Sequence, residues 1–219
     1  MWDTCQVSHI ASRGPGRPPA AKAAETRERI LHAAREVFSE LGYDAATFQA
    51  IAIRADLTRP AINHYFRNKR DLFREVVDQT NRFVVAAGAE LAQKATTLVD
   101  RLEAFIGAAF LADSKDRSAA AFLVTAVLES QRHPELRQSQ NDSLESSRLF
   151  VTWAVDEAIK SGELAADTDV RSTVEMLVAV LWGMGFYAGF VGSPDDLARI
   201  IGQLRLLLEQ RLWTHKAVN

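Results

Sequence analysis

The chain has 219 residues, of which 47% are hydrophobic and 25% are charged, so it can bury a core and is not an intrinsically disordered protein. Its net charge of -2 is unevenly distributed. Residues 1–75 hold 12 Lys and Arg against 9 Asp and Glu, whereas residues 76–219 hold 14 against 19. A basic N-terminal part joined to an acidic remainder indicates a small anion-binding module attached to a larger domain with another role.

The single cysteine, Cys5, can form no internal disulfide, and no Cys and His residues have the spacing of a zinc site. The first residues lack the charged start and long apolar segment of a signal peptide. The longest apolar stretch, residues 176–191, is interrupted by three glycines and is shorter than the roughly 18 residues of a membrane span. We therefore expect a buried helix there, and a cytoplasmic protein with no membrane span, metal or cofactor.

Residues 1–24 are rich in Gly, Pro and Ala and are expected to form a flexible basic arm. Within this arm, Gly16-Arg17-Pro18 is similar to the core of AT-hook segments, which would allow Arg17 to enter a narrow A·T minor groove. The alternative is a solubilising tail with no DNA contact.

The first predicted helix runs from Thr26 to Leu41. Apolar residues such as Ile30, Ala34 and Phe38 recur at helical spacing on one face, and charged residues occupy the other. Gly42 follows the last apolar residue and can end the helix in a left-handed conformation.

Residues 47–69 carry the main functional signal. A short helix is predicted from Thr47 to Arg54, and a second from Arg59 to Tyr65 after a four-residue interruption. Thr58 can cap the second helix, and Pro60 lies in its first turn, where a missing N–H costs nothing. Two short helices joined by a tight turn, in a region rich in arginine, predict a helix-turn-helix that binds DNA.

The remainder of the chain predicts further helices and no strand, because no segment alternates with a period of two. The expected helices are 68–94, 97–112, 117–132, 135–161, 168–191 and 195–213. The predicted fold is all-α, with about nine helices: an N-terminal three-helix bundle with the helix-turn-helix, then a larger helical domain. We expect the DNA-binding domain at residues 25–70 and the body at residues 71–219.

The helix-turn-helix region resembles the TetR family of bacterial regulators over residues 27–73. The residues that match the family in order and spacing are Ile30, Ala33, Ala34, Phe38, Gly42, Thr47, Ile51, Ala52, Ala55, Leu57, Thr58, Tyr65, Phe66, Lys69 and Leu72. Two positions depart from the pattern. Asp56 replaces the usual turn glycine, although Asp tolerates a left-handed backbone, and Asn63 replaces an aromatic residue.

The resemblance implies a homodimer that places the Arg59–Tyr65 helix of each subunit in successive major grooves of a near-palindromic operator. It also implies that the body binds a small molecule and thereby moves these helices out of register. The expected function is a repressor that a small hydrophobic effector releases from its operator.

DNA contacts are expected at the start of the second short helix. Arg59 could bond guanine, Thr58 and Pro60 could contact a thymine methyl group, and Asn63 could read adenine. The full predicted DNA-binding set is Thr47, Thr58, Arg59, Pro60, Ala61, Asn63, His64, Tyr65, Lys69 and Arg17. Within it, Thr47, His64, Tyr65 and Lys69 suit phosphate contacts, two of them at helix N-termini. The alternative for Arg59 is a phosphate clamp or a solvated charge.

In the body, bulky aromatic residues suggest a cavity for a hydrophobic effector, although ordinary core packing is the alternative. The predicted effector-binding residues are Phe83, Phe105, Phe122, Thr125, Glu129, Trp153 and Phe186. Glycines in the last apolar helices would allow close approach of a second subunit, or close packing within one chain. The predicted dimer interface comprises Val178, Trp182, Gly185, Gly189, Leu204 and Leu208.

Two other functions compete with this interpretation. An enzyme on an all-α scaffold is one, but the sequence contains no HExxH, P-loop, GxSxG or paired Glu-x-x-His motif. The other is an architectural DNA-binding protein without an effector, which the Gly-Arg-Pro arm suggests.

Overall fold

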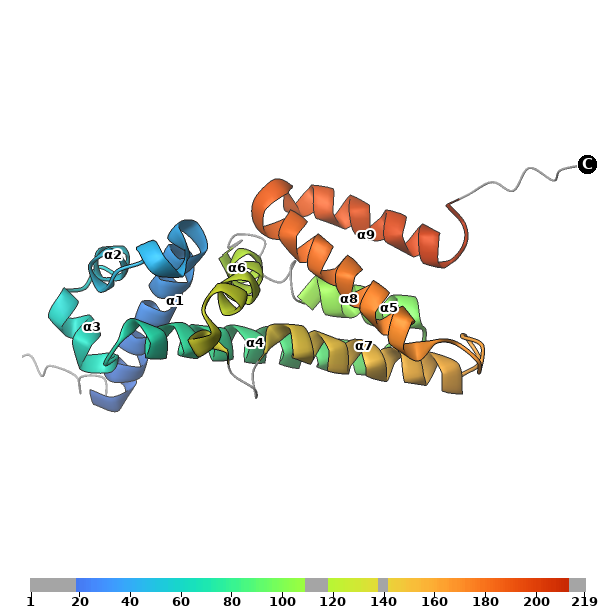
Figure 1. Cartoon of the computed structure of the whole chain (residues 1–219), viewed down its shortest axis with the longest axis horizontal. Helices are drawn as coiled ribbons and strands as arrows, with labels where there is room; N and C mark the ends of the chain where they lie inside the picture. The colour runs from blue at the N-terminus through green and yellow to red at the C-terminus, as the bar shows by residue number, and fades with distance from the viewer. Residues whose placement is uncertain (1–18, 109–117, 138–141, 213–219) are drawn as a thin grey trace, which may run out of the picture.

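The computed structural model describes residues 19–108, 118–137 and 142–212, without the side chains of 85–87 and 194 (Figure 1). Within these ranges the chain forms nine α-helices and no strand, so the predicted all-α fold is confirmed. The α-helices are α1 (Pro19–Ala45), α2 (Phe48–Arg54), α3 (Arg59–Tyr65), α4 (Lys69–Gln93), α5 (Leu98–Ile106), α6 (Ser118–Arg132), α7 (Ser143–Lys160), α8 (Val170–Phe186) and α9 (Pro194–Leu208). A 3₁₀ turn, η2 (Pro134–Leu136), precedes α7, and a π-helical segment, η3 (Tyr187–Val191), continues α8.

The helices form two connected groups. Figure 1 shows α1, α2 and α3 at one end of the molecule, with α4 running from them along the body. Helix α6 packs against α1 on one side and against α8 and η3 on the other, so it lies between the two groups. Helix α9 contacts α5 and η3 at the far side of the body.

Local capping explains why the helix-turn-helix has the bounds that the sequence predicts. Thr47, Thr58 and Asn68 are the N-caps of α2, α3 and α4, and each side chain accepts a backbone N–H from three residues further on. These bonds satisfy donors that the first helical turn leaves free. Asp56 has a φ of 51°, so the turn uses the left-handed conformation that aspartate tolerates.

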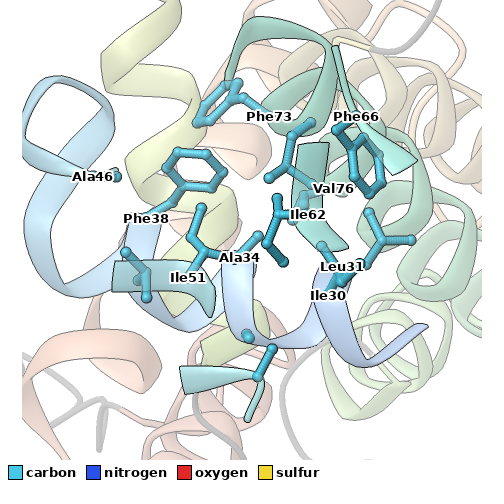
Figure 2. Close-up of a cluster of buried hydrophobic side chains, with 14 of the residues drawn as sticks. Ile30, Leu31, Ala34, Phe38, Ala46, Ile51, Ile62, Phe66, Phe73 and Val76 are labelled. Carbon is cyan, nitrogen blue, oxygen red and sulfur yellow. The ribbon is translucent and has the colours of Figure 1, made fainter. Parts of the chain in front are cut away.

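The DNA-binding domain has a core of buried apolar side chains that converge from α1, α2, α3 and α4 (Figure 2). Phe38, Ile51 and Ile62 are fully buried there. The Phe73 ring of α4 meets the Phe38 ring edge-on at 5.0 Å, and the Phe122 ring of α6 lies 5.5 Å from Phe73. The core therefore crosses residue 70 and includes a side chain from the body.

Three predicted helix bounds are wrong. The first helix begins at Pro19 rather than Thr26, because its alanine-rich start favours helix, and residues 19–24 are therefore not part of a flexible arm. Helix α9 ends at Leu208 rather than at residue 213. The α-helical part of α5 ends at Ile106 and residues 107–108 are π-helical, whereas the predicted end at residue 112 lies outside the described residues. The helix expected at 135–161 begins only at Ser143, where the side chain of Asp142 accepts the N–H of Leu144 at 2.9 Å. Cys5, Arg17 and the Gly-Arg-Pro motif lie outside the described residues.

Helix α8 and η3 are buried on one face only. Among the described residues, the continuous segment Val170–Val191 is long and apolar enough to cross a membrane by length and composition, and 39% of its most apolar window is buried. One face packs against α6 and α7, whereas Met176, Phe186 and Phe190 are about half exposed. The expectation of a fully buried helix is therefore corrected to a helix with one free apolar face.

Candidate nucleic-acid interface and effector cavity

Helix α3 is anchored by one face and presents the other to solvent. Ile62 is fully buried in the core, whereas Arg59, Asn63 and His64 are exposed. Arg59 forms no ion pair with any described residue, so its five N–H donors are available to a partner. The remaining predicted contacts at this end are Thr47, Thr58 and Pro60, which are exposed, and Ala61 and Tyr65, which are half-buried.

The turn before α3 is held by an arginine from α1. The Nη2 atom of Arg29 donates to the backbone oxygen of Ala55 at 2.7 Å and to that of Asp56 at 3.3 Å. Because charge-assisted bonds of this kind are stronger than neutral ones, they fix the angle between α2 and α3. The position of the exposed side chains on α3 is therefore determined by α1.

Lys69 has a different environment from the one predicted. Its ammonium group donates to the backbone oxygens of Tyr43 at 2.6 Å, Asp44 at 3.0 Å and Ala46 at 3.1 Å, and lies 4.5 Å from the centre of the Tyr43 ring. An ammonium group has three N–H donors, so all are used within the protein. The structure thus favours a clamp on the end of α1 over the predicted phosphate contact by this side chain.

Other cations of the region divide into paired and free groups. Arg54 bonds Glu40 at 2.7 Å and Glu36 at 3.2 Å, and its hydrogen bond holds the pKa of Glu40 below the ordinary value. Arg67 and Arg70, which flank the end of α3, are exposed and have no ion pair with any described residue. They are therefore better candidates for phosphate contacts than Lys69. The sequence shows their charge but not which arginines the fold leaves unpaired.

Helix α6 is joined to α1 at both of its ends. At its start, Arg35 Nε of α1 donates to Ser118 Oγ at 2.9 Å. Near its end, the carboxylate of Glu129 accepts the backbone N–H of Tyr43 at 3.3 Å and lies 3.6 Å from His133 Nε2. Glu129 is only 5% exposed, so this contact lies inside the joint between the DNA-binding domain and the body.

A small cavity of about 30 Å³ lies in the body, and its walls come from five helices. Its lining residues are Asn81 and Val84 of α4, Phe105 of α5, Ala120, Leu123 and Val124 of α6, Ser143 and Ser147 of α7, and Leu181, Trp182 and Gly185 of α8. Trp182 Nε1 is buried and has no hydrogen-bond partner among the described residues. The lining is largely apolar and therefore suits an apolar ligand, for which the surrounding side chains would have to move apart.

Only Phe105 of the predicted effector residues lies among those that line this cavity. Phe122 is part of the core of the DNA-binding domain, and Glu129 belongs to the joint with α1. Phe83 and Phe186 are more than half exposed. Thr125 bonds the backbone of Ala121 within α6, and Trp153 lies beside Arg101. Sequence reasoning missed Asn81 and the two serines, whose inward orientation no local pattern reveals.

The predicted dimer residues of α8 and η3 face inward rather than outward. Val178 is buried, Gly185 and Trp182 line the cavity, and a Cβ atom on Gly189 would lie 2.7 Å from the Cα of Ala121. Leu204 and Leu208 are half-buried against the body core. The exposed face of the same segment is instead a stripe of five residues, here called the α8 stripe. It comprises Met176, Ala179, Gly183, Phe186 and Phe190.

The fold and this interface define a helix-turn-helix protein with a separate all-helical body. The family model described as bacterial regulatory proteins, tetR family, matches residues 30–76, and that of the tetracyclin repressor-like C-terminal domain matches residues 95–204. The chain therefore belongs to the TetR family, and it is a DNA-binding transcriptional regulator.

Relatives and solved structures agree with this assignment. The chain is 31% identical over 157 residues to the fatty acid metabolism regulator protein of Bacillus subtilis, covering 70% of this chain and 78% of the relative. It is 24% identical over 163 residues to the transcriptional regulator UidR of Escherichia coli, covering 74% and 81%. The structure of Salmonella enterica GusR has the same fold, with a TM-score of 0.66, 22% identity and coverage of 86% and 95%.

Proposed function

We propose that the protein is a cytoplasmic, homodimeric repressor that binds a near-palindromic operator through α3 and is released by a small apolar effector. One observation carries the DNA-binding part of this proposal. Helix α3 buries Ile62 and presents Arg59 and Asn63 on its free face, with no ion pair among the described residues to occupy the arginine. An anchored short helix with free polar side chains at its start is the geometry that reads base edges in a major groove.

The DNA contacts divide by role. Arg59 bonds guanine and Asn63 bonds adenine, since their side chains match those base edges. Arg67 and Arg70 contact phosphates, which fixes the register of α3 but reads no sequence. Thr47 and His64 add polar contacts at the edge of the interface.

The α8 stripe supports the homodimer. Its apolar side chains project to solvent at helical spacing, and a Cβ atom on Gly183 would meet no atom within 4 Å. Two copies of this face related by a two-fold axis can approach closely at Gly183 and bury Phe186 and Phe190. The half-exposed Leu207 of α9 extends the same apolar surface.

Effector binding and DNA binding are coupled through α6. This helix supplies Leu123 and Val124 to the cavity and Phe122 to the core of the DNA-binding domain. A ligand that shifts α6 therefore moves Phe122 against Phe38 and Phe73, because a close-packed core does not deform smoothly. In this proposal residues 25–70 form the DNA-binding domain, and residues 71–219 bind the effector and dimerise.

A titration of fluorescent duplex DNA from upstream of the gene, with a scrambled duplex as control, tests the proposal. We expect the natural duplex to bind about 10³-fold more tightly or better, with an affinity that falls steeply as salt rises. Equal affinity for the two duplexes would argue against a sequence-specific regulator. It would leave the architectural alternative, and absence of any DNA binding would leave the enzyme alternative.

A further inference from the structure

Arg101, in the middle of α5, is a buried cation that belongs neither to the DNA contacts nor to the dimer surface of the proposed function. It is 8% exposed, and neither Nε nor Nη1 of its guanidinium has a hydrogen-bond partner within the described part of the chain. Removing an unpaired charge from water is strongly unfavourable unless other groups bond it. We therefore expect Arg101 to have a partner beyond the described residues of the chain.

The carboxylates near Arg101 are committed to other cations. Glu157 of α7 bonds Lys160 at 2.8 Å, and this bond is the main cause of its lowered pKa, to which Arg101 adds only a weaker attraction through space. On α5 itself, Asp100 bonds Arg205 at 2.6 Å, and Glu103 bonds the same guanidinium. The acidic groups of α5 and Glu157 of α7 therefore already have a partner. Asp156, beside Glu157, forms no ion pair with any described residue, and it does not lie within ion-pair distance of Arg101.

A row of aromatic rings leads from Arg101 to the cavity. The guanidinium carbon lies 5.4 Å from the centre of the Trp153 ring, which holds the group by a cation–π contact. Trp153 is 5.9 Å from Phe150, and Phe150 stacks on Phe105 at 4.1 Å. Phe105 lines the cavity, and it follows Arg101 by about one helical turn on α5.

We propose that Arg101 binds the carboxylate of an amphipathic effector, whose apolar part lies along Trp153, Phe150 and Phe105 towards the cavity. The planar guanidinium matches a carboxylate in geometry and charge, and the aromatic row matches an apolar chain or ring. This inference rests on the proposed function, since it names the chemical class of the effector for the same cavity.

The test compares two carboxylates with their own alcohols: octanoate with octanol, and phenylbutyrate with phenylbutanol. Dissociation constants are measured by calorimetry on the full-length wild-type protein, on Arg101→Met and on Arg171→Met. Arg171 is an exposed arginine at the start of α8 and serves as the matched control. For the wild type and the control we expect at least one carboxylate to bind about tenfold more tightly than its alcohol, or better.

In Arg101→Met this preference should disappear, with the carboxylate binding no better than the alcohol. The preference is the ratio of the two dissociation constants of one variant. A general loss of stability affects both constants alike and leaves this ratio unchanged. Equal binding of each pair to the wild type, a preference that survives in Arg101→Met, or no binding of any probe would overturn the inference. Operator binding by the wild type is measured in parallel, and its failure would count against the proposed function instead.

Discussion

The buried carboxylate of Glu129 on α6 accepts the backbone N–H of Tyr43 at the end of α1, at 3.3 Å. Gly42, with a φ of 75°, precedes this contact, and a Cβ atom on it would lie 3.0 Å from the same carboxylate oxygen. The body therefore meets the DNA-binding domain where Gly42 adopts a left-handed backbone conformation and where the buried Glu129 carboxylate holds the end of α1.

Replacing Glu129 by Ala should lower the free energy of unfolding by about 1–3 kcal/mol, because the Tyr43 N–H and the neighbouring Arg132 lose their partner. Glu129→Gln retains an acceptor oxygen and should cost less. Urea denaturation measures both, with Glu145→Ala, an exposed position on α7, as control. An Ala variant as stable as the wild type would show that the contact does not hold the joint.

Replacing Arg59 by Ala should relax the sequence preference of the protein and cost about 1–3 kcal/mol on the cognate operator. The physical reason is the loss of a bidentate bond to a base, which only the cognate sequence supplies. Anisotropy titrations on the operator and on single-base variants measure the effect. If the variant discriminates among these duplexes as well as the wild type, Arg59 does not read bases.

Arg70 and Lys69 are neighbours in sequence but should respond differently to substitution. Arg70→Ala should weaken binding to all duplexes and reduce the slope of log affinity against log salt by about one, as for one lost phosphate contact. Lys69→Met should leave that slope unchanged and reduce stability, since its ammonium group holds three backbone oxygens of the α1 end. The reverse result would restore Lys69 as the phosphate contact.

Replacing Phe186 by Asp should convert the dimer to a monomer, because the α8 stripe would then carry a charge that must lose water on association. Leu149→Asp is the matched control, since Leu149 is 66% exposed on α7 and lies outside the stripe. Sedimentation equilibrium measures the mass of each variant. A dimer that persists in Phe186→Asp, or one lost equally in Leu149→Asp, would place the interface elsewhere.

The bounds of α2 and α3 could be predicted because their determinants are local. Thr47 and Thr58 are caps that act within three residues, and Asp56 needs only its own backbone conformation. Apolar periodicity likewise identified Ile30, Ala34 and Phe38 as one face of the first helix, and all three are buried in the core. The family resemblance further implied that the second of the two short helices enters the major groove of DNA.

Contacts between distant segments could not be predicted in the same way. An apolar glycine-rich helix has two faces, and only the packing of Gly189 on Ala121 decides which one remains free. The position of Lys69 depends on carbonyl groups of α1, more than 20 residues earlier in the chain. Arg101 belongs to no sequence motif. Its significance comes from its burial and from two guanidinium nitrogens that have no partner among the described residues.

Selection of bound sequences from a library of random duplexes tests the central claim most directly, since it assumes no operator. The full-length protein should enrich a near-palindromic sequence with two half-sites about one helical turn apart, or a multiple of this, as two α3 helices in a symmetric dimer require. Enrichment of a single unrepeated site, or of no sequence at all, would contradict the account.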